Sequence, residues 1–196
     1  MLPTSTLQIY GEFTEEIPPS EEYLTLHFSP NSAARKRRWG NFGLSADFLG
    51  DYFAAFFPGD EVPESKINLR DTVKAAVSFI ANELLENAVK FNEDAANCPV
   101  SISLHLYERE IIFCVVNYAN PTIAETYQTF IRELLNSDLD EFYTQQLEKA
   151  ATGMSGSSMG LLTMINDYAA RFGWKFQPFE PYPDVIEVRV LVRLDL

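Results

Sequence analysis

The chain has 196 residues, of which 46% are hydrophobic and 13% aromatic, a composition typical of a folded globular protein with a sizeable core. Its 28 acidic and 15 basic residues give a formal net charge of −13, which argues against nucleic acid or an anionic membrane as a partner. The two cysteines are too few for a disulfide framework or a cysteine-based metal site.

A cytoplasmic location is expected from what the sequence lacks. No signal-peptide pattern opens the chain, and no run of about 18 apolar residues predicts a membrane span. Reduced cysteines fit that compartment.

The first third of the chain predicts a lead-in, a strand and a helix. Residues 1–20 are interrupted by glycine and prolines and predict an irregular lead-in with a short strand at 7–10, before a single domain at 21–196. Alternation over 21–29 predicts a strand with one buried face. Helical spacing of apolar residues predicts a helix over 44–57, with Ser45 as its N-cap. The basic cluster Arg35–Arg38 is either a solvated surface or a docking site for an acidic partner or a phosphate.

Residues 71–92 predict a long amphipathic helix, because their apolar residues recur at the helical period. Glu83, Asn87 and Lys90 are spaced by four and three residues and therefore share one side of that helix. Asn87 falls inside the apolar arc, where an amide without partners costs roughly 1–3 kcal/mol. Its partner is either a neighbouring loop, as for many asparagines at the edge of a core, or a ligand.

The second half of the chain predicts two strands followed by helices. Residues 100–106 alternate and 111–116 are continuously apolar, which indicates a hairpin with a central second strand. Residues 122–151 predict one or two helices, which fit an ordinary amphipathic pair packed on the sheet.

A loop of small residues at 153–160 leads into a helix predicted over 161–172, with Gly173 just after its end. Such a loop presents free backbone N–H groups to an anion, although it is also a common way to start a helix. Strands are predicted from 174 and over 185–196.

The segment 83–90, ELLENAVK, resembles the N-box of the GHKL ATPases, the superfamily of histidine kinases, anti-sigma-factor serine kinases, type II topoisomerases and heat-shock chaperones. The resemblance implies that Asn87 holds Mg²⁺ against the phosphates of ATP and that Glu83 acts as the base. It places Lys90 near the phosphates.

Two later segments resemble the glycine boxes of the same family. In the first box, Asp-x-Gly-x-Gly, the aspartate accepts a hydrogen bond from the adenine amino group; here Asn117 takes that place, and Ala119 and Pro121 replace the glycines. In the second box, Gly156 and Gly160 match the outer glycines and Ser158 replaces the middle one. The resemblance implies nucleotide contacts by Asn117, Gly156, Ser158 and Gly160.

The order of elements predicts an α/β two-layer sandwich, in which a mixed, mostly antiparallel sheet carries helices on one face. This looks like the Bergerat ATP-binding fold, with a lid over about 121–156. Within the family, the chain resembles the bacterial anti-sigma-factor kinases of partner-switching pathways. They use ATP and Mg²⁺ to phosphorylate a serine or threonine of a small antagonist or sigma-regulator-type protein.

Two alternatives stay open at this point. The chain is a degenerate GHKL domain that binds a protein partner without catalysis, or an ATP-gated binding module without transfer activity. The oligomeric state is also open, with a homodimer among the options.

Overall fold

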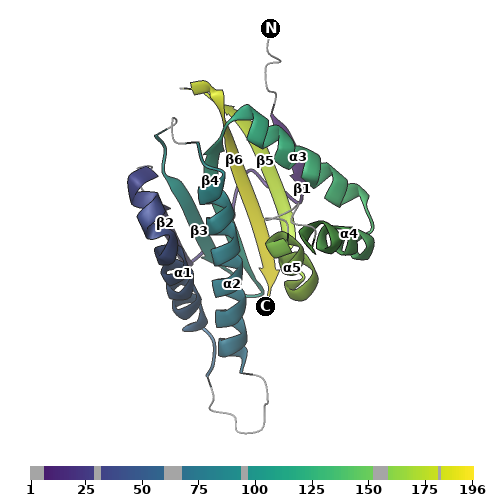
Figure 1. Cartoon of the computed structure of the whole chain (residues 1–196). Coiled ribbons are helices and arrows are strands. Elements are labelled where there is room, and N and C mark those ends of the chain that lie inside the picture. Colours follow the sequence, from purple (N-terminus) through teal and green to yellow (C-terminus); the bar gives the residue numbers. More distant parts are fainter. Residues whose placement is uncertain (1–6, 29–31, 60–67, 94–96, 152–158, 181) are drawn as a thin grey trace.

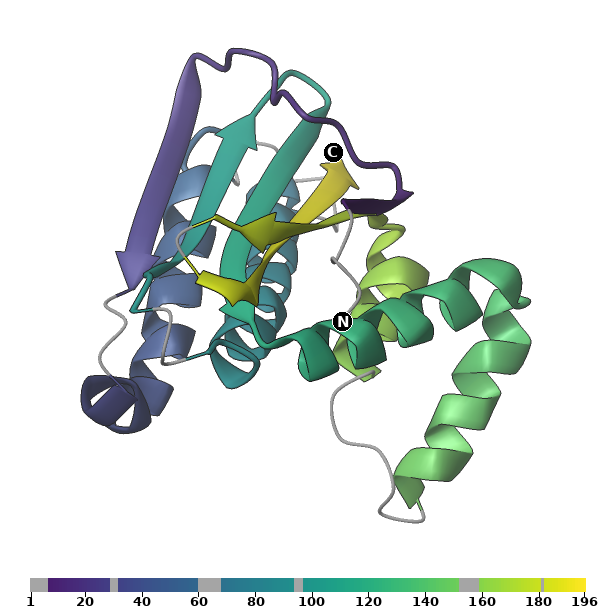
Figure 2. The same cartoon turned by 90° about the horizontal axis from the view of Figure 1, so that it is seen from above.

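One layer of helices covers one face of a single β-sheet (Figures 1 and 2). The computed structural model describes residues 7–28, 32–59, 68–93, 97–151, 159–180 and 182–196. Within them, the helices are α1 Ser32–Ala54, α2 Leu69–Lys90, α3 Pro121–Asn136, α4 Leu139–Ala151 and α5 Met159–Tyr168. The strands are β1 Gln8–Gly11, β2 Glu22–Phe28, β3 Val100–Leu106, β4 Glu110–Ala119, β5 Arg171–Phe179 and β6 Tyr182–Asp195.

The six strands form an antiparallel sheet in the order β1-β5-β6-β4-β3-β2, which confirms the predicted α/β sandwich. The apolar run of β4 lies at its centre and pairs along its whole length with β6. Both faces of β4 are covered there, since Ile111, Ile112 and Phe113 are all fully buried. Continuous apolar sequence is what a strand buried on both faces requires.

The helix predicted at 71–92 is α2, and its apolar stripe faces the sheet and α1. Asn68 caps it, because its side chain accepts hydrogen bonds from the backbone N–H groups of Arg70 (3.0 Å) and Asp71 (3.4 Å). The buried stripe runs from Val73 to Val89 and consists of Val73, Ala76, Val77, Ile80, Ala81, Leu84, Leu85, Ala88 and Val89.

The short strand predicted at 7–10 is present as β1, at the edge of the sheet opposite β2. The connection between them therefore has to run from one edge to the other, as Figure 2 shows. Side-chain contacts hold it along the way: Glu15 pairs with Lys175 at 2.6 Å, and the Ser20 hydroxyl donates to the backbone oxygen of Leu106 at 2.7 Å. The N-terminal lead-in is thus attached to the sheet at both ends.

Two predicted boundaries are wrong. The helix predicted over 161–172 ends at Tyr168, and Gly173 lies inside β5 rather than after a helix. Ala169 adopts a left-handed conformation (φ 51°) that stops the helix, and Phe172, Trp174 and Phe176 then alternate onto the buried face of the strand. The spacing between Leu161 and Phe172 fits a helix only by coincidence.

The helix predicted to begin near residue 44 begins at Ser32 instead, so Ser45 lies inside α1 and is not its N-cap. The cluster Arg35–Arg38 is part of this helix, and its side chains lie outside the described residues.

We predict that Gly173→Ala destabilises the fold by about 1–3 kcal/mol, the usual cost of overpacking. A Cβ at this position would lie 2.6 Å from the carbonyl carbon of Glu12 and even closer to the backbone of Phe13, so the crossing segment would have to move. Urea unfolding measures the change. The matched control is Gly43→Ala in α1, where a Cβ meets open space and helix propensity should add about 0.5–1 kcal/mol. Equal effects of the two substitutions would contradict this close packing.

Candidate functional site

A cavity of about 450 Å³ lies between the helical layer and the sheet. Its walls come from α2, α3, α4, α5, β4 and β6, and they are mainly apolar. A small number of polar groups in an apolar cavity is the usual composition of a small-molecule site. The polar residues that line it are Asn87, Asn117, Thr122, Thr126 and Gln146.

Asn87 reaches this cavity from α2. The helix buries Leu84 and Ala88 on the same side, and both also line the cavity, so Asn87 is held half-buried at its wall. Within the described residues, no hydrogen bond to its side-chain amide is present. The neighbouring-loop partner considered for this asparagine is therefore not seen in the described part of the chain.

Asn117 reaches the same cavity from β4. Val115 and Ala119 on the same face of the strand also line the cavity, and the cross-strand partner of Asn117 is Val188. The side chain is only 5% exposed, and in the part of the chain that is described it has no hydrogen-bond partner. Ser78 Oγ, not the Asn117 amide, is the fully buried side-chain atom without a partner among the described residues, so the Asn117 amide is not fully enclosed and can form hydrogen bonds to a ligand in the cavity.

Glu83 lies one helical turn before Asn87 and meets the first turn of α5. A Cβ added to Gly160 would overlap its carboxylate, so a residue without a side chain is needed there. Burial, and secondarily the negative charge of Glu86, raise the pKa of Glu83 above its ordinary value. No salt bridge to Glu83 is found among the described residues. A half-buried carboxylate of this kind is a better base near neutral pH than a solvated one.

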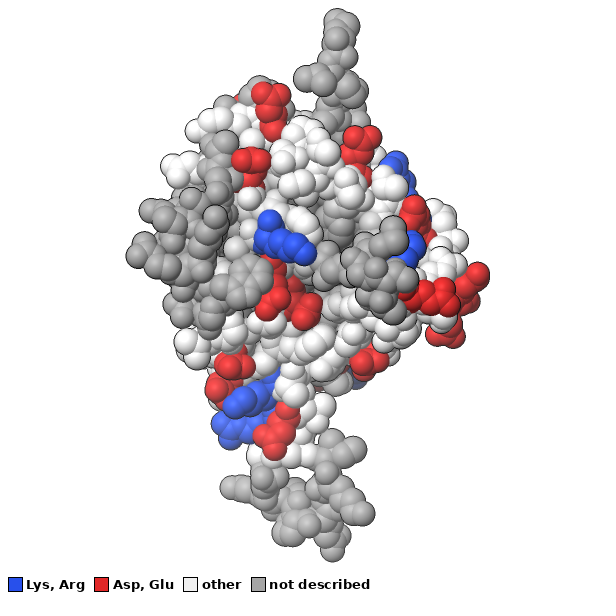
Figure 3. All heavy atoms as spheres, in the orientation of Figure 1, with Lys and Arg blue, Asp and Glu red and all other residues white. Residues whose placement is uncertain are grey.

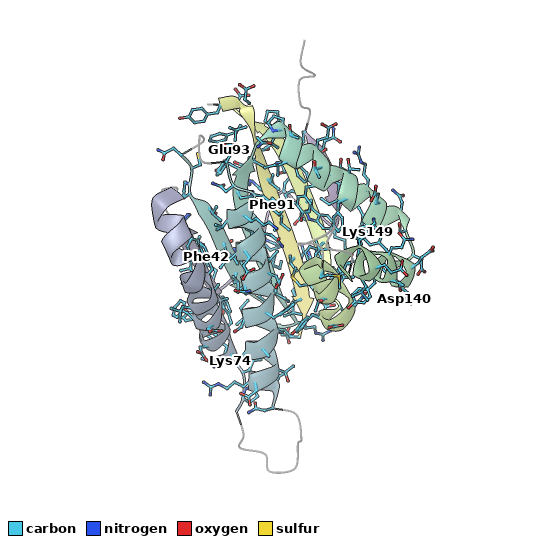
Figure 4. All side chains as sticks on the ribbon, viewed as in Figure 1. Phe42, Lys74, Phe91, Glu93, Asp140 and Lys149 are labelled. Carbon is cyan, nitrogen blue, oxygen red and sulfur yellow. The ribbon has the colours of Figure 1, made fainter. Side chains whose placement is uncertain are left out.

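The remaining predicted residues are placed differently. Lys90 is exposed, and its ammonium nitrogen lies 5.2 Å from the centroid of the Phe91 ring. Phe91, labelled in Figure 4, follows the last turn of α2 and lines the cavity. Gly156 and Ser158 lie outside the described residues.

The structure thus brings Asn87 and Asn117 to one cavity and Glu83 to the start of α5. It leaves Lys90 at the surface.

Two residues of the site were not found from the sequence. Gln146 of α4 is 4% exposed and lines the cavity, and Phe142 one turn earlier packs in the core. Their spacing of four residues is the signal that could have found them. Tyr127 of α3 also lines the cavity, and its hydroxyl accepts a hydrogen bond from the indole nitrogen of Trp174 at 2.9 Å. Burial raises the pKa of Tyr127 to about 12.

The side-chain oxygen atoms present suit a hard cation that is bound partly by the protein and partly by a phosphate ligand, rather than a metal site built from protein side chains alone. Among the residues that the structure describes, no group of three or more His, Cys, Asp or Glu side chains is placed to hold a metal ion. Asn87 and Glu83 nevertheless offer oxygen atoms on one side of α2, and Mg²⁺ commonly takes one or two protein oxygens with phosphates and water completing its shell. None of the described helices is long and apolar enough to cross a membrane.

Comparison with known proteins adds support at the level of fold. No protein-family model and no curated protein sequence matches the chain. A chain in the crystal structure of the SiaB–SiaC complex from Pseudomonas aeruginosa is similar, with a TM-score of 0.51 and 15% sequence identity. The similarity covers 88% of this chain and 89% of that chain, so the two share one architecture over nearly their full lengths.

We predict that Glu83→Gln raises the thermal midpoint by about 2–5 °C at pH 7. The folded protein favours the protonated form of this carboxyl, so its stabilising effect is present below the pKa of the unfolded chain and is lost as the pH rises through the folded pKa. Glutamine mimics the protonated form, and the gain should therefore shrink toward pH 4. Calorimetric melting between pH 4 and pH 8 measures it.

Glu125→Gln on the exposed side of α3 is the control, with little change expected at any pH. A Glu83→Gln protein that melts below the wild type at pH 7 would show that the ionised carboxylate is stabilised by its surroundings.

Proposed function

We propose that this chain binds ATP with Mg²⁺ in the cavity and transfers the terminal phosphoryl group to a serine or threonine of a small antagonist or sigma-regulator-type protein in a bacterial partner-switching pathway. The observation that carries the proposal is the convergence of Asn87 and Asn117. Two side-chain amides that have no hydrogen-bond partner among the described residues, on a helix and a strand far apart in the sequence, face one apolar cavity. Glu83 lies one turn along the same helix.

Each residue has a separate role in this proposal. Asn117 meets the base, whose rings occupy the apolar part of the cavity. Asn87 offers its amide oxygen to the cation, and Glu83 accepts the proton of the attacking hydroxyl. Bound Mg²⁺ supplies charge neutralisation at the phosphates, which is the main requirement of phosphoryl transfer.

The phosphates are assigned to the start of α5. Backbone N–H groups in the first turn of a helix attract anions, and Gly160 lies in that turn. Gly156 and Ser158, in the segment before α5, are proposed to donate further hydrogen bonds to the phosphates. Lys90 is proposed to approach the phosphates from α2.

The negative charge of the protein adds a requirement. Acidic side chains gather over α4 at one edge of the helical face (Figure 3), where Asp140 and Glu141 occupy the first turn of the helix. With a formal net charge of −13, the protein repels a free nucleotide anion. Binding should therefore depend strongly on Mg²⁺.

A protein partner is supported by the similar chain, which was crystallised in the SiaB–SiaC complex. This chain has the same architecture, and large apolar side chains on the outer side of α1 are exposed, including Leu44 (66%) and Phe48 (50%). Exposed apolar side chains of this size are common where proteins dock.

The second candidate function is a non-catalytic regulator that binds a protein partner. The end of β4 favours it. Asn120 accepts a hydrogen bond from the backbone N–H of Ile123 at 2.9 Å and caps α3, whose first residue is Pro121. A capped helix start with proline is rigid, whereas glycines in this segment would let the backbone approach a nucleotide closely.

We predict that calorimetric titration detects MgATP binding and that Asn87→Ala weakens it at least tenfold, through loss of a cation ligand. Omission of Mg²⁺ should weaken wild-type binding to a similar degree. Asn82→Ala is the matched control, because Asn82 lies on the same helix but bonds to Glu86 (3.1 Å) and does not line the cavity. No binding at millimolar ATP would contradict the proposal and favour the regulator.

We further predict that Glu83→Gln lowers phosphoryl transfer at least a hundredfold, through loss of the base, while changing ATP affinity less than about threefold. The assay follows radiolabelled phosphate from ATP to serine or threonine in soluble extract of the source cells, with extract alone as the blank. Transfer by Glu83→Gln at the wild-type rate would remove Glu83 from the mechanism.

A further inference from the structure

Asn117 is the most deeply buried polar group at the cavity that has no protein partner in the described residues. Its side chain is flanked along β4 by Val115 and Ala119 and across the sheet by Val188, none of which has a polar side chain. Nothing described in the structure therefore fixes which end of its amide is the oxygen and which is the nitrogen. The side-chain amide of Asn117 can flip by 180° about its Cβ–Cγ bond, which exchanges the positions of its oxygen and nitrogen without changing its shape or breaking a hydrogen bond.

This freedom matters because an amide carries one acceptor and one donor group side by side. Adenine presents a donor at its 6-amino group next to the acceptor N1. Guanine presents an acceptor at O6 next to a donor at N1, the reverse pattern on the same edge. An amide in one orientation pairs with adenine, and the same amide turned by half a rotation pairs with guanine.

A carboxylate at this place would act differently. It offers acceptors only, so on this edge it accepts one hydrogen bond from either kind of base, from the 6-amino group of adenine or from N1–H of guanine or hypoxanthine. Its other oxygen then lies against an acceptor, N1 of adenine or O6 of hypoxanthine, and only guanine offers a second donor, its 2-amino group. An unpaired acceptor in a buried site weakens binding, so a carboxylate cannot match both patterns as an amide can.

We propose that the cavity takes guanine as well as adenine nucleotides and that Asn117 is the residue that sets this relaxed choice of purine. The inference rests on the proposed nucleotide binding at this cavity. It goes beyond that function by naming purine nucleoside triphosphates of both kinds as the ligand class. Pyrimidines lack the second ring that fills the apolar part of the cavity and are expected to bind poorly.

The test is calorimetric titration of the full chain with the Mg²⁺ complexes of ATP, GTP, ITP and CTP. Wild-type affinities for ATP and GTP should agree within about fivefold, because the amide pairs with either base. Hypoxanthine, the base of ITP, has O6 and the N1 proton of guanine but no 2-amino group, so ITP should bind like GTP. CTP should bind at least tenfold more weakly.

Asn117→Asp should weaken ATP and ITP alike, at least tenfold, because the carboxylate lies against N1 of adenine and against O6 of hypoxanthine. Asn166→Asp, at an exposed position of α5, is the matched control and should keep the wild-type affinities. If Asn117→Asp does not fold, the wild-type comparison of ATP with GTP and ITP still decides the question.

The outcomes separate the two levels of the proposal. ATP binding with GTP and ITP more than fiftyfold weaker in the wild type would overturn the relaxed choice of purine and leave nucleotide binding in place. ATP and ITP binding unchanged in Asn117→Asp would overturn the role of Asn117. Failure of all four nucleotides to bind would overturn the proposed function itself, and this inference with it.

Discussion

The packing of α2 on the centre of the sheet is the interaction on which the rest of the structure depends. The helix buries its apolar stripe against α1, β3 and β4, and the side chains of Ile80, Leu85 and Phe113 in this layer are completely buried. Close packing of this kind allows little relative movement. It therefore sets the positions of Asn87 and Asn117 with respect to each other and leaves the cavity at the edge of the contact, where α3, α4 and α5 complete the wall.

Polar groups that lack partners stand out against this apolar layer, but they do not all have the same meaning. Ser78 Oγ is fully buried without a hydrogen bond in the described structure, and it lies against Gly50 in the tight contact between α1 and α2. Ser78 is not among the residues that line the cavity beside Asn117. Asn117 differs because a cavity lies beside it, and Glu83 differs because it lies against Gly160 in the first turn of α5. Unpaired groups at such places lower stability and gain a role only when a ligand binds.

The connections around the cavity show how the outer elements are held in place. The hydrogen bond from the Trp174 indole to the Tyr127 hydroxyl connects β5 to α3. The Tyr10 hydroxyl of β1 donates a hydrogen bond to the side-chain oxygen of Gln128 in α3 at 3.3 Å. Phe142 anchors α4 over the same region. The fold similarity to a chain of the SiaB–SiaC complex covers 88% of this chain, so it extends over most of the sequence and not over the sheet core alone.

The sequence by itself determined the features that depend on local periodicity. Helical spacing identified α2 and the common side of Glu83 and Asn87, and alternation identified β2 and β3, because neighbouring residues alone decide which face a side chain occupies. Tertiary structure alone decided which of these faces meet. The contact of Glu83 with Gly160, the shared cavity of Asn87 and Asn117, and the place of Gln146 all join segments distant in the chain. Gly173 belongs to a strand for the same reason: pairing with β6 and packing against the N-terminal segment are non-local contacts, which no pattern of neighbouring residues contains.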